Sequence, residues 1–141
     1  DVALAVEADG VHLGQSDMPI TMARKIAGRS LIIGISAEST DDALRAARQG
    51  ADYIGISPVF ATPTKTDTAP PLGLEGIKRI RELVDIPLVG IGGINQENAA
   101  SVIAAGADGV AVVSAIVSAD DPTGASKQLK TLVDLASSEK K

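Results

Sequence analysis

Apolar positions along the chain fall into five short runs, separated by longer stretches of mixed character. Each run is rich in Val, Ile or Leu and is bounded by Gly, Asp or Pro, which is typical of short buried strands. The runs cover 10–14, 31–36, 53–57, 87–91 and 109–114. Counted between Val11, Ile32, Ile54, Val89 and Val112, they are spaced by 21, 22, 35 and 23 residues. The pattern therefore predicts five strands.

The intervening stretches carry the period of an amphipathic helix. In 126–136, for example, Leu129, Leu132, Val133 and Ala136 share one stripe. Other helices are predicted at the very start of the chain and between the strands, with Ser39 and Asn95 as N-caps of the third and fifth. The predicted helices cover 1–7, 19–27, 41–49, 74–84, 96–105 and 126–136.

Strand and helix alternate about every 22 residues, which predicts a parallel α/β sheet. A weak repeat agrees, because Ala8-Asp9-Gly10, Gly50-Ala51-Asp52 and Gly106-Ala107-Asp108 each precede a strand. Two architectures remain open. One is a complete, doubly wound five-stranded sheet. The other is a TIM-type (β/α)8 barrel, of which residues 1–141 would form the C-terminal part of a single domain, with about five units.

A complete barrel takes about 250 residues, so the barrel interpretation expects three units before Asp1. The chain begins with Asp rather than Met, which agrees with a missing upstream segment. We favour the barrel because of the candidate site residues described next.

Composition and charge exclude several classes of protein. There is no Cys, so disulfides and thiol chemistry are ruled out, and a reducing cytoplasm is the expected location. The net charge is −5 and Lys and Arg are dispersed, which argues against a nucleic-acid surface. No apolar run approaches the roughly 18 residues of a membrane-spanning helix.

The third strand-to-strand step is about a dozen residues longer than the others, and the excess falls in 59–73. This stretch lacks apolar periodicity and follows a strand, so it should lie at the carboxyl edge of the sheet, where ligands bind in parallel α/β folds. Thr62, Thr64 and Lys65, with Pro63 between them, suit a phosphate or pyrophosphate. The alternative is a solvated loop whose Thr residues bond to its own backbone.

Two later loops point to the same chemistry. Gly92 and Gly93 follow the fourth strand and lead into a helix, while Ser114 ends the fifth. Glycine backbone and a helix N-terminus bind anions readily, and barrels commonly hold phosphate between their last two strand-end loops. We therefore expect Gly93 and Ser114 to bind a phosphate group, rather than to serve only as turn residues.

The first two strands add further candidates. Asp17 follows the first strand and could bind Mg²⁺, or it could cap the helix that follows. Ser36 ends the second strand and could donate to a phosphate or simply begin a turn. His12, the single histidine, lies within a strand and is interpreted as a packed or supporting residue, not as a base.

Several segments together resemble the thiamine phosphate synthase family. They read HLGQSDMP, GIS, GADYIGISPVFATPTKTD, PLGLEGIKRIRE, IGGINQENAA and GADGVAVVSAI, in the family's order and over nearly the whole chain. The resemblance implies that Asp17 binds Mg²⁺, that Ser36 contacts a pyrimidine diphosphate and that Lys65 holds the departing pyrophosphate. It also implies that the thiazole phosphate is bound by Thr62, Pro63, Thr64, Gly93, Val113 and Ser114.

The reaction implied by the resemblance couples 4-amino-2-methyl-5-(diphosphooxymethyl)pyrimidine with a hydroxyethylthiazole phosphate, giving thiamine phosphate and pyrophosphate by a dissociative, Mg²⁺-dependent route. Its partners would be small-molecule substrates, with neither nucleic acid nor membrane, and a homo-oligomer is left open. The family's Gln-x-Arg-Glu-Lys and Asn-Asp elements are not found among the 141 residues. We therefore expect the chain alone to be inactive.

Three alternatives remain. A thiazole tautomerase would keep the thiazole phosphate site without joining substrates, although Asp17 and the Thr64–Lys65 pair argue against it. Another phosphate-binding barrel enzyme would be expected to place a catalytic acid or lysine on its strands, and the strand interiors here have none. A non-catalytic, phosphate-binding barrel fragment is the third.

Overall fold

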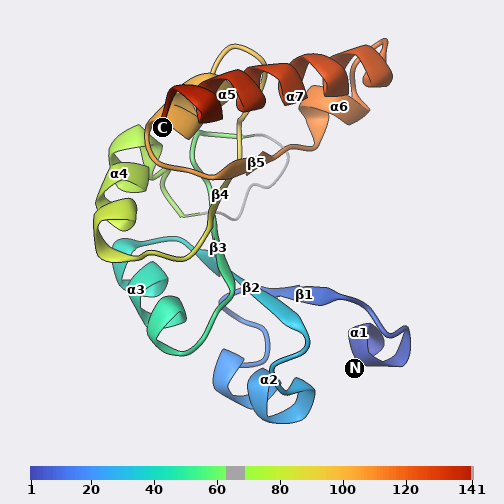
Figure 1. Cartoon of the computed structure of the whole chain (residues 1–141), viewed down its shortest axis with the longest axis vertical. Helices are drawn as coiled ribbons and strands as arrows, with labels where there is room; N and C mark the ends of the chain where they lie inside the picture. Colours follow the sequence, from blue (N-terminus) through green and yellow to red (C-terminus); the bar gives the residue numbers. More distant parts are fainter. Residues whose placement is uncertain (63–68, 141) are drawn as a thin grey trace.

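The computed structural model describes residues 1–62 and 69–140 (Figure 1). Its centre is a five-stranded sheet in which every neighbouring pair is parallel. The strands are β1 (Gly10–Leu13), β2 (Ile32–Ala37), β3 (Tyr53–Ile56), β4 (Leu88–Ile91) and β5 (Gly109–Ala111). All five lie within the predicted runs or within one residue of them.

The strands lie in the sheet in the order in which they occur in the chain, β1-β2-β3-β4-β5. A doubly wound sheet reverses its strand order part-way, which sends its helices to both faces. Right-handed crossovers without a reversal keep the helices on one face, as in a (β/α) barrel. The barrel-type α/β prediction is confirmed, and the doubly wound alternative is wrong.

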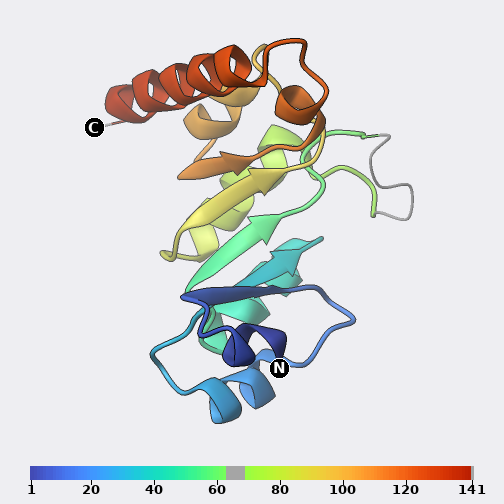
Figure 2. The ribbon, with the colours of Figure 1, turned by 90° about the vertical axis from the view of Figure 1, so that its right-hand side faces the viewer.

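Seven helices are present in the described part of the chain, and Figures 1 and 2 show α3 and α4 against the same face of the central strands. At the β5 end, α5 packs against α7. The helices are α1 (Val2–Ala5), α2 (Ile20–Ala27), α3 (Thr40–Arg48), α4 (Gly73–Leu83), α5 (Ala99–Ala104), α6 (Ser114–Val117) and α7 (Pro122–Glu139). No helix among the described residues is both long enough and apolar enough to cross a membrane.

The two faces of the sheet differ sharply in burial. On the helix-covered face, Ile33, Ile54, Ile56 and Leu88 are fully buried and pack against α3, α4 and α5. On the opposite face Ile32 is 50% exposed. That second face, which we call the inner face, carries polar and small residues that include His12, Gly34, Ser36, Tyr53 and Gly55. The core of this chain thus lies between the sheet and its helices.

The predicted Gly-Ala-Asp repeat has a structural role at two of its three positions. Gly50 and Gly106, with φ of 93° and 124°, follow the last residues of α3 and α5. The aspartates after them, Asp52 and Asp108, each accept a backbone N–H from a neighbouring strand, from Ile33 at 2.7 Å and from Leu88 at 2.8 Å. We call these two sites the Asp clamps.

Each Asp clamp is completed by an arginine from the helix that precedes the neighbouring strand. Arg24 of α2 binds Asp52, and Arg81 of α4 binds Asp108 at 3.0 Å. Burial alone would raise the pKa of Asp52, but the Ile33 N–H and the Arg24 guanidinium outweigh it and lower that pKa. The same clamp between β2 and β3 and again between β4 and β5 indicates a repeated unit of two strands and two helices.

The largest differences from the predicted elements are in three places. Strand β5 ends at Ala111, and Ser114 begins the short helix α6, which the prediction missed. Helix α7 begins at Pro122, four residues early, because the Asp121 side chain accepts from the Gly124 N–H and caps it. Helix α5 begins at Ala99 rather than at residue 96.

The late start of α5 has a local cause. The Asn95 side chain accepts from the Glu97 N–H at 2.8 Å, and the Asn98 side chain accepts from the Asn95 N–H at 2.9 Å. Asparagine side chains that bond to nearby backbone compete with helical hydrogen bonds. Residues 96–98 therefore form turns, and the role of Asn95 as the N-cap of this helix passes to Asn98.

Candidate active site

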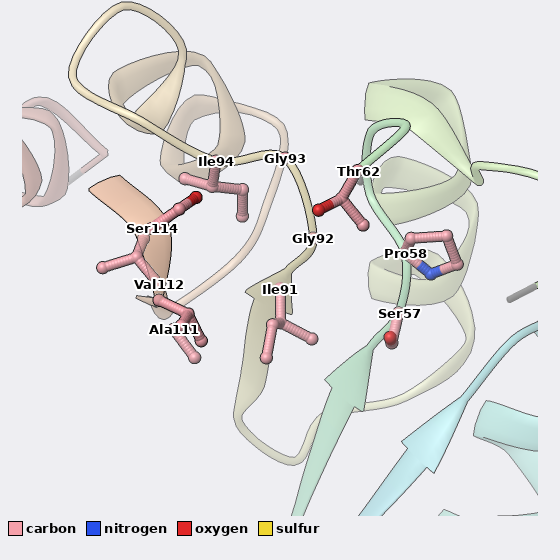
Figure 3. Close-up of a pocket in the computed structure, with 11 residues that line it drawn as sticks. Ser57, Pro58, Thr62, Ile91, Gly92, Gly93, Ile94, Ala111, Val112 and Ser114 are labelled. Atoms are coloured by element: carbon pink, nitrogen blue, oxygen red, sulfur yellow. The ribbon is translucent and has the colours of Figure 1, made fainter. Parts of the chain in front are cut away.

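The segments that follow β3, β4 and β5 enclose a pocket at the carboxyl edge of the sheet (Figure 3). Its volume is about 110 Å³. Sites that enclose a whole small molecule usually measure about 300–1,000 Å³, so this pocket has the size for one substituent of a ligand. The lining residues are Ser57, Pro58, Thr62, Ile91, Gly92, Gly93, Ile94, Ala111, Val112, Val113 and Ser114.

The floor of the pocket is a turn that requires glycine. Gly92 and Gly93 have φ of 100° and 64°, in the left-handed region that other residues avoid. A Cβ at Gly92 would stand 2.8 Å from Pro58 Cβ, and one at Gly93 would stand 2.6 Å from the Ala61 carbonyl oxygen. Glycine is thus needed both for the backbone conformation and for the close approach of the loop after β3.

The two loops are joined by main-chain hydrogen bonds that continue the sheet beyond its strands. Val59 N donates to Ile91 O at 2.8 Å, and Phe60 N donates to Gly92 O at 3.0 Å. On the other side of the turn, the Asn98 amide donates to Gly93 O at 3.0 Å. The backbone of Gly92 and Gly93 is therefore held from both sides.

The hydroxyl groups of the pocket come from opposite walls. Figure 3 shows the Thr62 and Ser114 side chains directed from the two sides toward the Gly92–Gly93 turn. Ser114 is the first residue of α6, and Val113 before it is 52% exposed. The structure thus brings together four of the predicted residues, Thr62, Gly93, Val113 and Ser114.

The lining offers hydroxyls and glycine backbone and contains no titratable side chain among the described residues. Neutral donors around a half-buried glycine turn suit a phosphate group, which accepts hydrogen bonds from backbone N–H and hydroxyl groups. The segment that carries Pro63, Thr64 and Lys65 lies outside the described residues, so these three predictions have no structural test.

Ser36 and Asp17 form a second group of candidates, nearer to β1, and neither lines the pocket. The Ser36 hydroxyl lies 2.9 Å from His12 Nε2, and the Gln15 side-chain amide donates to the Ser36 carbonyl. His12 therefore supports another candidate residue, in agreement with its interpretation from the sequence.

Asp17 stabilises its own loop, because its Oδ2 accepts from the Gly14 N–H at 2.6 Å. The alternative that Asp17 caps the next helix is wrong: α2 begins at Ile20, and its N-cap residue is Pro19. Within residues 1–62 and 69–140, no three His, Cys, Asp or Glu side chains gather as a metal site would need. A Mg²⁺ ion that takes one carboxylate and completes its shell with water and phosphate oxygens still fits Asp17.

Several lining residues were not predicted from the sequence, among them Ser57, Ile91 and Ala111. Ile91 pairs with Ala111 in the sheet, so their side chains point the same way. Alternation along each strand, counted inward from the strand end, could have identified such residues. The positions of Tyr53 and Gln15 beside His12 and Ser36 could not be foreseen, because they depend on the register between strands.

Comparison with known proteins decides the family. The family model described as thiamine monophosphate synthase matches residues 1–116. The chain belongs to this family. It is 59% identical over 135 residues to the thiamine-phosphate synthase of Chloroflexus aurantiacus, with 96% of this chain and 62% of the relative covered. It is 54% identical over 136 residues to that of Moorella thermoacetica, with coverages of 96% and 65%.

Solved structures agree with this membership of the thiamine monophosphate synthase family. The thiamine phosphate pyrophosphorylase of Pyrococcus furiosus superposes with a TM-score of 0.88 at 48% identity, covering 96% of this chain and 64% of that one. A 3-hexulose-6-phosphate synthase superposes with a TM-score of 0.73 at 24% identity, which is evidence for the fold alone. The chain spans a little over three-fifths of the curated relatives, 62% and 65% of the two named above.

Proposed function

We propose that this chain carries the thiazole phosphate half of a thiamine phosphate synthase active site. The observation that carries the proposal is the pocket at the strand ends, where Thr62, Gly93 and Ser114 converge in a chain of this family. The phosphate of a hydroxyethylthiazole phosphate would occupy this pocket, held by the hydroxyl groups and the glycine turn. The thiazole ring would then extend across the carboxyl edge of the sheet.

In the proposed reaction the bond between the pyrimidine methylene carbon and the diphosphate oxygen breaks, and its electron pair leaves with pyrophosphate. The thiazole nitrogen then donates its lone pair to the resulting cation, which forms the carbon–nitrogen bond of thiamine phosphate. No proton transfer is required of the chain. The residues at the carboxyl edge of the sheet would contribute by orienting the two substrates and limiting the access of water to the cation.

Ser36 and Asp17 are proposed to serve the diphosphate half. Asp17 would hold Mg²⁺, which supplies positive charge that stabilises the departing pyrophosphate. The Ser36 hydroxyl would donate to the diphosphate, and Lys65 is proposed to add a further positive charge. The Gln-x-Arg-Glu-Lys and Asn-Asp elements expected of the family do not occur in the 141 residues. We therefore propose that the joining step also needs groups from outside them.

The test is a chimera in which the part of the Chloroflexus aurantiacus relative that this chain does not match is joined to it. Supplied with both substrates and Mg²⁺, the chimera should produce thiamine phosphate and pyrophosphate in equal amounts. Chromatography measures the thiamine phosphate, and a coupled phosphate assay measures the pyrophosphate. The chain alone should bind thiazole phosphate without forming product. A correctly folded chimera that releases pyrophosphate without thiamine phosphate, or that makes neither, would contradict the proposal.

A further inference from the structure

Three polar side chains from three neighbouring strands meet on the inner face of the sheet. His12 of β1 lies between Ser36 of β2 and Tyr53 of β3, with Nε2 2.9 Å from the Ser36 hydroxyl and Nδ1 2.9 Å from the Tyr53 hydroxyl. The two rings are 5.4 Å apart between centroids. We call these residues the His12 relay. Both ring nitrogens of the histidine are thereby engaged.

Two glycines make room for the relay. Gly34 pairs with both His12 and Tyr53 in the sheet, and a Cβ at Gly34 would stand 2.0 Å from Tyr53 Cζ. A Cβ at Gly55 would stand 2.9 Å from His12 Cε1. Real atoms cannot approach so closely, so the rings occupy the space that larger residues would fill. Glycine at positions 34 and 55 is therefore needed for the His12 and Tyr53 rings to lie where they do.

The protonation of His12 decides what Ser36 can do. Burial lowers the pKa of His12, and the negative charge of Asp17 only partly opposes that effect. A neutral imidazole has one N–H and one acceptor nitrogen, so two arrangements are available. If Nδ1 carries the hydrogen, Nε2 must accept the Ser36 proton. If Nε2 carries it, Nε2 donates to Ser36 and Tyr53 donates to Nδ1.

Only the second arrangement leaves the Ser36 hydroxyl hydrogen available to another acceptor. A diphosphate accepts hydrogen bonds and offers none when fully ionised, so it requires Ser36 as a donor. The Ser36 main chain is held as well, because Gln15 donates to its carbonyl and Arg45 donates to the Gln15 oxygen at 3.2 Å. The main chain that carries the Ser36 hydroxyl is therefore held in place, and only the direction of its O–H bond is left to be set.

We propose that His12, kept as the Nε2–H tautomer by the Tyr53 hydroxyl, is a positioning residue that presents Ser36 as a hydrogen-bond donor to a diphosphate group. The inference rests on the diphosphate role proposed above for Ser36. It adds two residues, His12 and Tyr53, which act through Ser36 and need not touch the substrate.

The chain has one histidine and one tyrosine, so the relay can be observed without ambiguity. In the ¹⁵N-labelled chain near neutral pH, long-range ¹H–¹⁵N correlations of the single imidazole report its tautomer. We expect the Nε2–H form to predominate, and the Tyr53→Phe variant to lose that preference while its ring still fills the space over Gly34. A predominant Nδ1–H form, or a tautomer unchanged in Tyr53→Phe, would overturn the proposal.

Affinity for inorganic pyrophosphate with Mg²⁺, measured by calorimetry, tests the consequence for binding. Ser36→Ala should weaken binding by about tenfold or more, the effect of losing a hydrogen bond to a charged group. Tyr53→Phe should weaken it severalfold in the unaltered chain and have no further effect when Ser36 is already Ala. Ser101→Ala, on the exposed side of α5, is the matched control and should bind normally.

The proposal would be contradicted if Tyr53→Phe lowered the affinity for pyrophosphate equally in the unaltered chain and in Ser36→Ala. It would also be contradicted if the unaltered chain bound no pyrophosphate. Failure of the proposed function would look different. In that case thiazole phosphate would not bind, or its binding would be unchanged in Ser114→Ala. Either result is independent of the tautomer of His12.

Discussion

Gly93 packs so closely against Ala61 that a Cβ on Gly93 would stand 2.6 Å from the Ala61 carbonyl oxygen. This contact brings the loop after β3 against the loop after β4, and with it brings Thr62 to the pocket. Gly93 therefore has two roles, because it allows the two loops to touch and also lines the pocket with its backbone.

Gly93→Ala should destabilise the chain by about 2–4 kcal/mol, the combined cost of a left-handed conformation and of overpacking. It should also weaken thiazole phosphate binding, since the loop must move away from Ala61. Gly109→Ala is the matched control, because a Cβ there meets nothing within 4 Å. Urea unfolding and calorimetry measure the two effects. Equal stability and equal affinity in the two variants would show that the Gly93 contact is not required.

Ser114→Ala should lower the affinity for thiazole phosphate by about tenfold or more, because a hydroxyl that donates to a phosphate makes a charge-assisted hydrogen bond. Stability should change little, since Ser114 starts a short helix at the surface. The loss should be absent with the unphosphorylated thiazole alcohol. A loss of the same size with the alcohol would place Ser114 at another part of the ligand.

The Asp clamps should stabilise the fold more than ordinary surface ion pairs do. Asp52→Ala and Asp108→Ala each leave a strand N–H without its carboxylate acceptor, so each should cost about 1–3 kcal/mol. Asp134→Ala, which removes the exposed pair with Lys130 on α7, should cost less than about 1 kcal/mol. Chemical unfolding compares the three variants, and indistinguishable costs would rule out a special role for the clamps.

The lowered pKa of Asp52 gives the same clamp a pH dependence. Because the folded pKa lies below the unfolded value of about 3.9, the contribution of Asp52 is complete above that pH. It should be lost as the pH falls further, through the folded pKa. The difference in stability between the unaltered chain and Asp52→Asn should therefore shrink below about pH 4, and a difference that stayed constant would contradict this origin.

His12 should make the chain less stable in mild acid. Its pKa is lowered in the folded state, chiefly by burial, so the unfolded chain binds a proton first. Stability should begin to fall as the pH drops below about 6.5, the unfolded value, and should continue to fall until the folded imidazole is protonated. The free energy of unfolding of the unaltered chain should be lower at about pH 5.5 than at about pH 7, whereas that of His12→Gln should be the same at both. A drop in His12→Gln with none in the unaltered chain would exclude this explanation.

Much of the fold could be predicted from the spacing of apolar runs, because each buried strand must be short, apolar and bounded by turns. The strand order could not be read from the spacing alone, and the choice between a barrel and a doubly wound sheet depended on the candidate site residues. Asn95 and Asn98 show a further limit, since their side chains compete with helical hydrogen bonds in a way that a period of 3.6 residues does not reveal.

The candidate site divides in the same way. Gly93 and Ser114 could be predicted, because strand-end residues in parallel folds share one edge. The His12 relay required the register of β1, β2 and β3, in which Gly34 lies between His12 and Tyr53. Such a meeting of side chains depends on the pairing of distant segments, and no local pattern encodes it.

The central claim is that the pocket between Gly93 and Ser114 holds the phosphate of a thiazole phosphate. The most direct test is an amide NMR titration of the ¹⁵N-labelled chain with hydroxyethylthiazole phosphate and, separately, with the unphosphorylated alcohol. We expect the phosphate ester to shift the amide signals of Gly92, Gly93 and Ser114 saturably, and the alcohol to leave them largely unchanged. Shifts located elsewhere on the chain, or equal shifts with the alcohol, would contradict the claim.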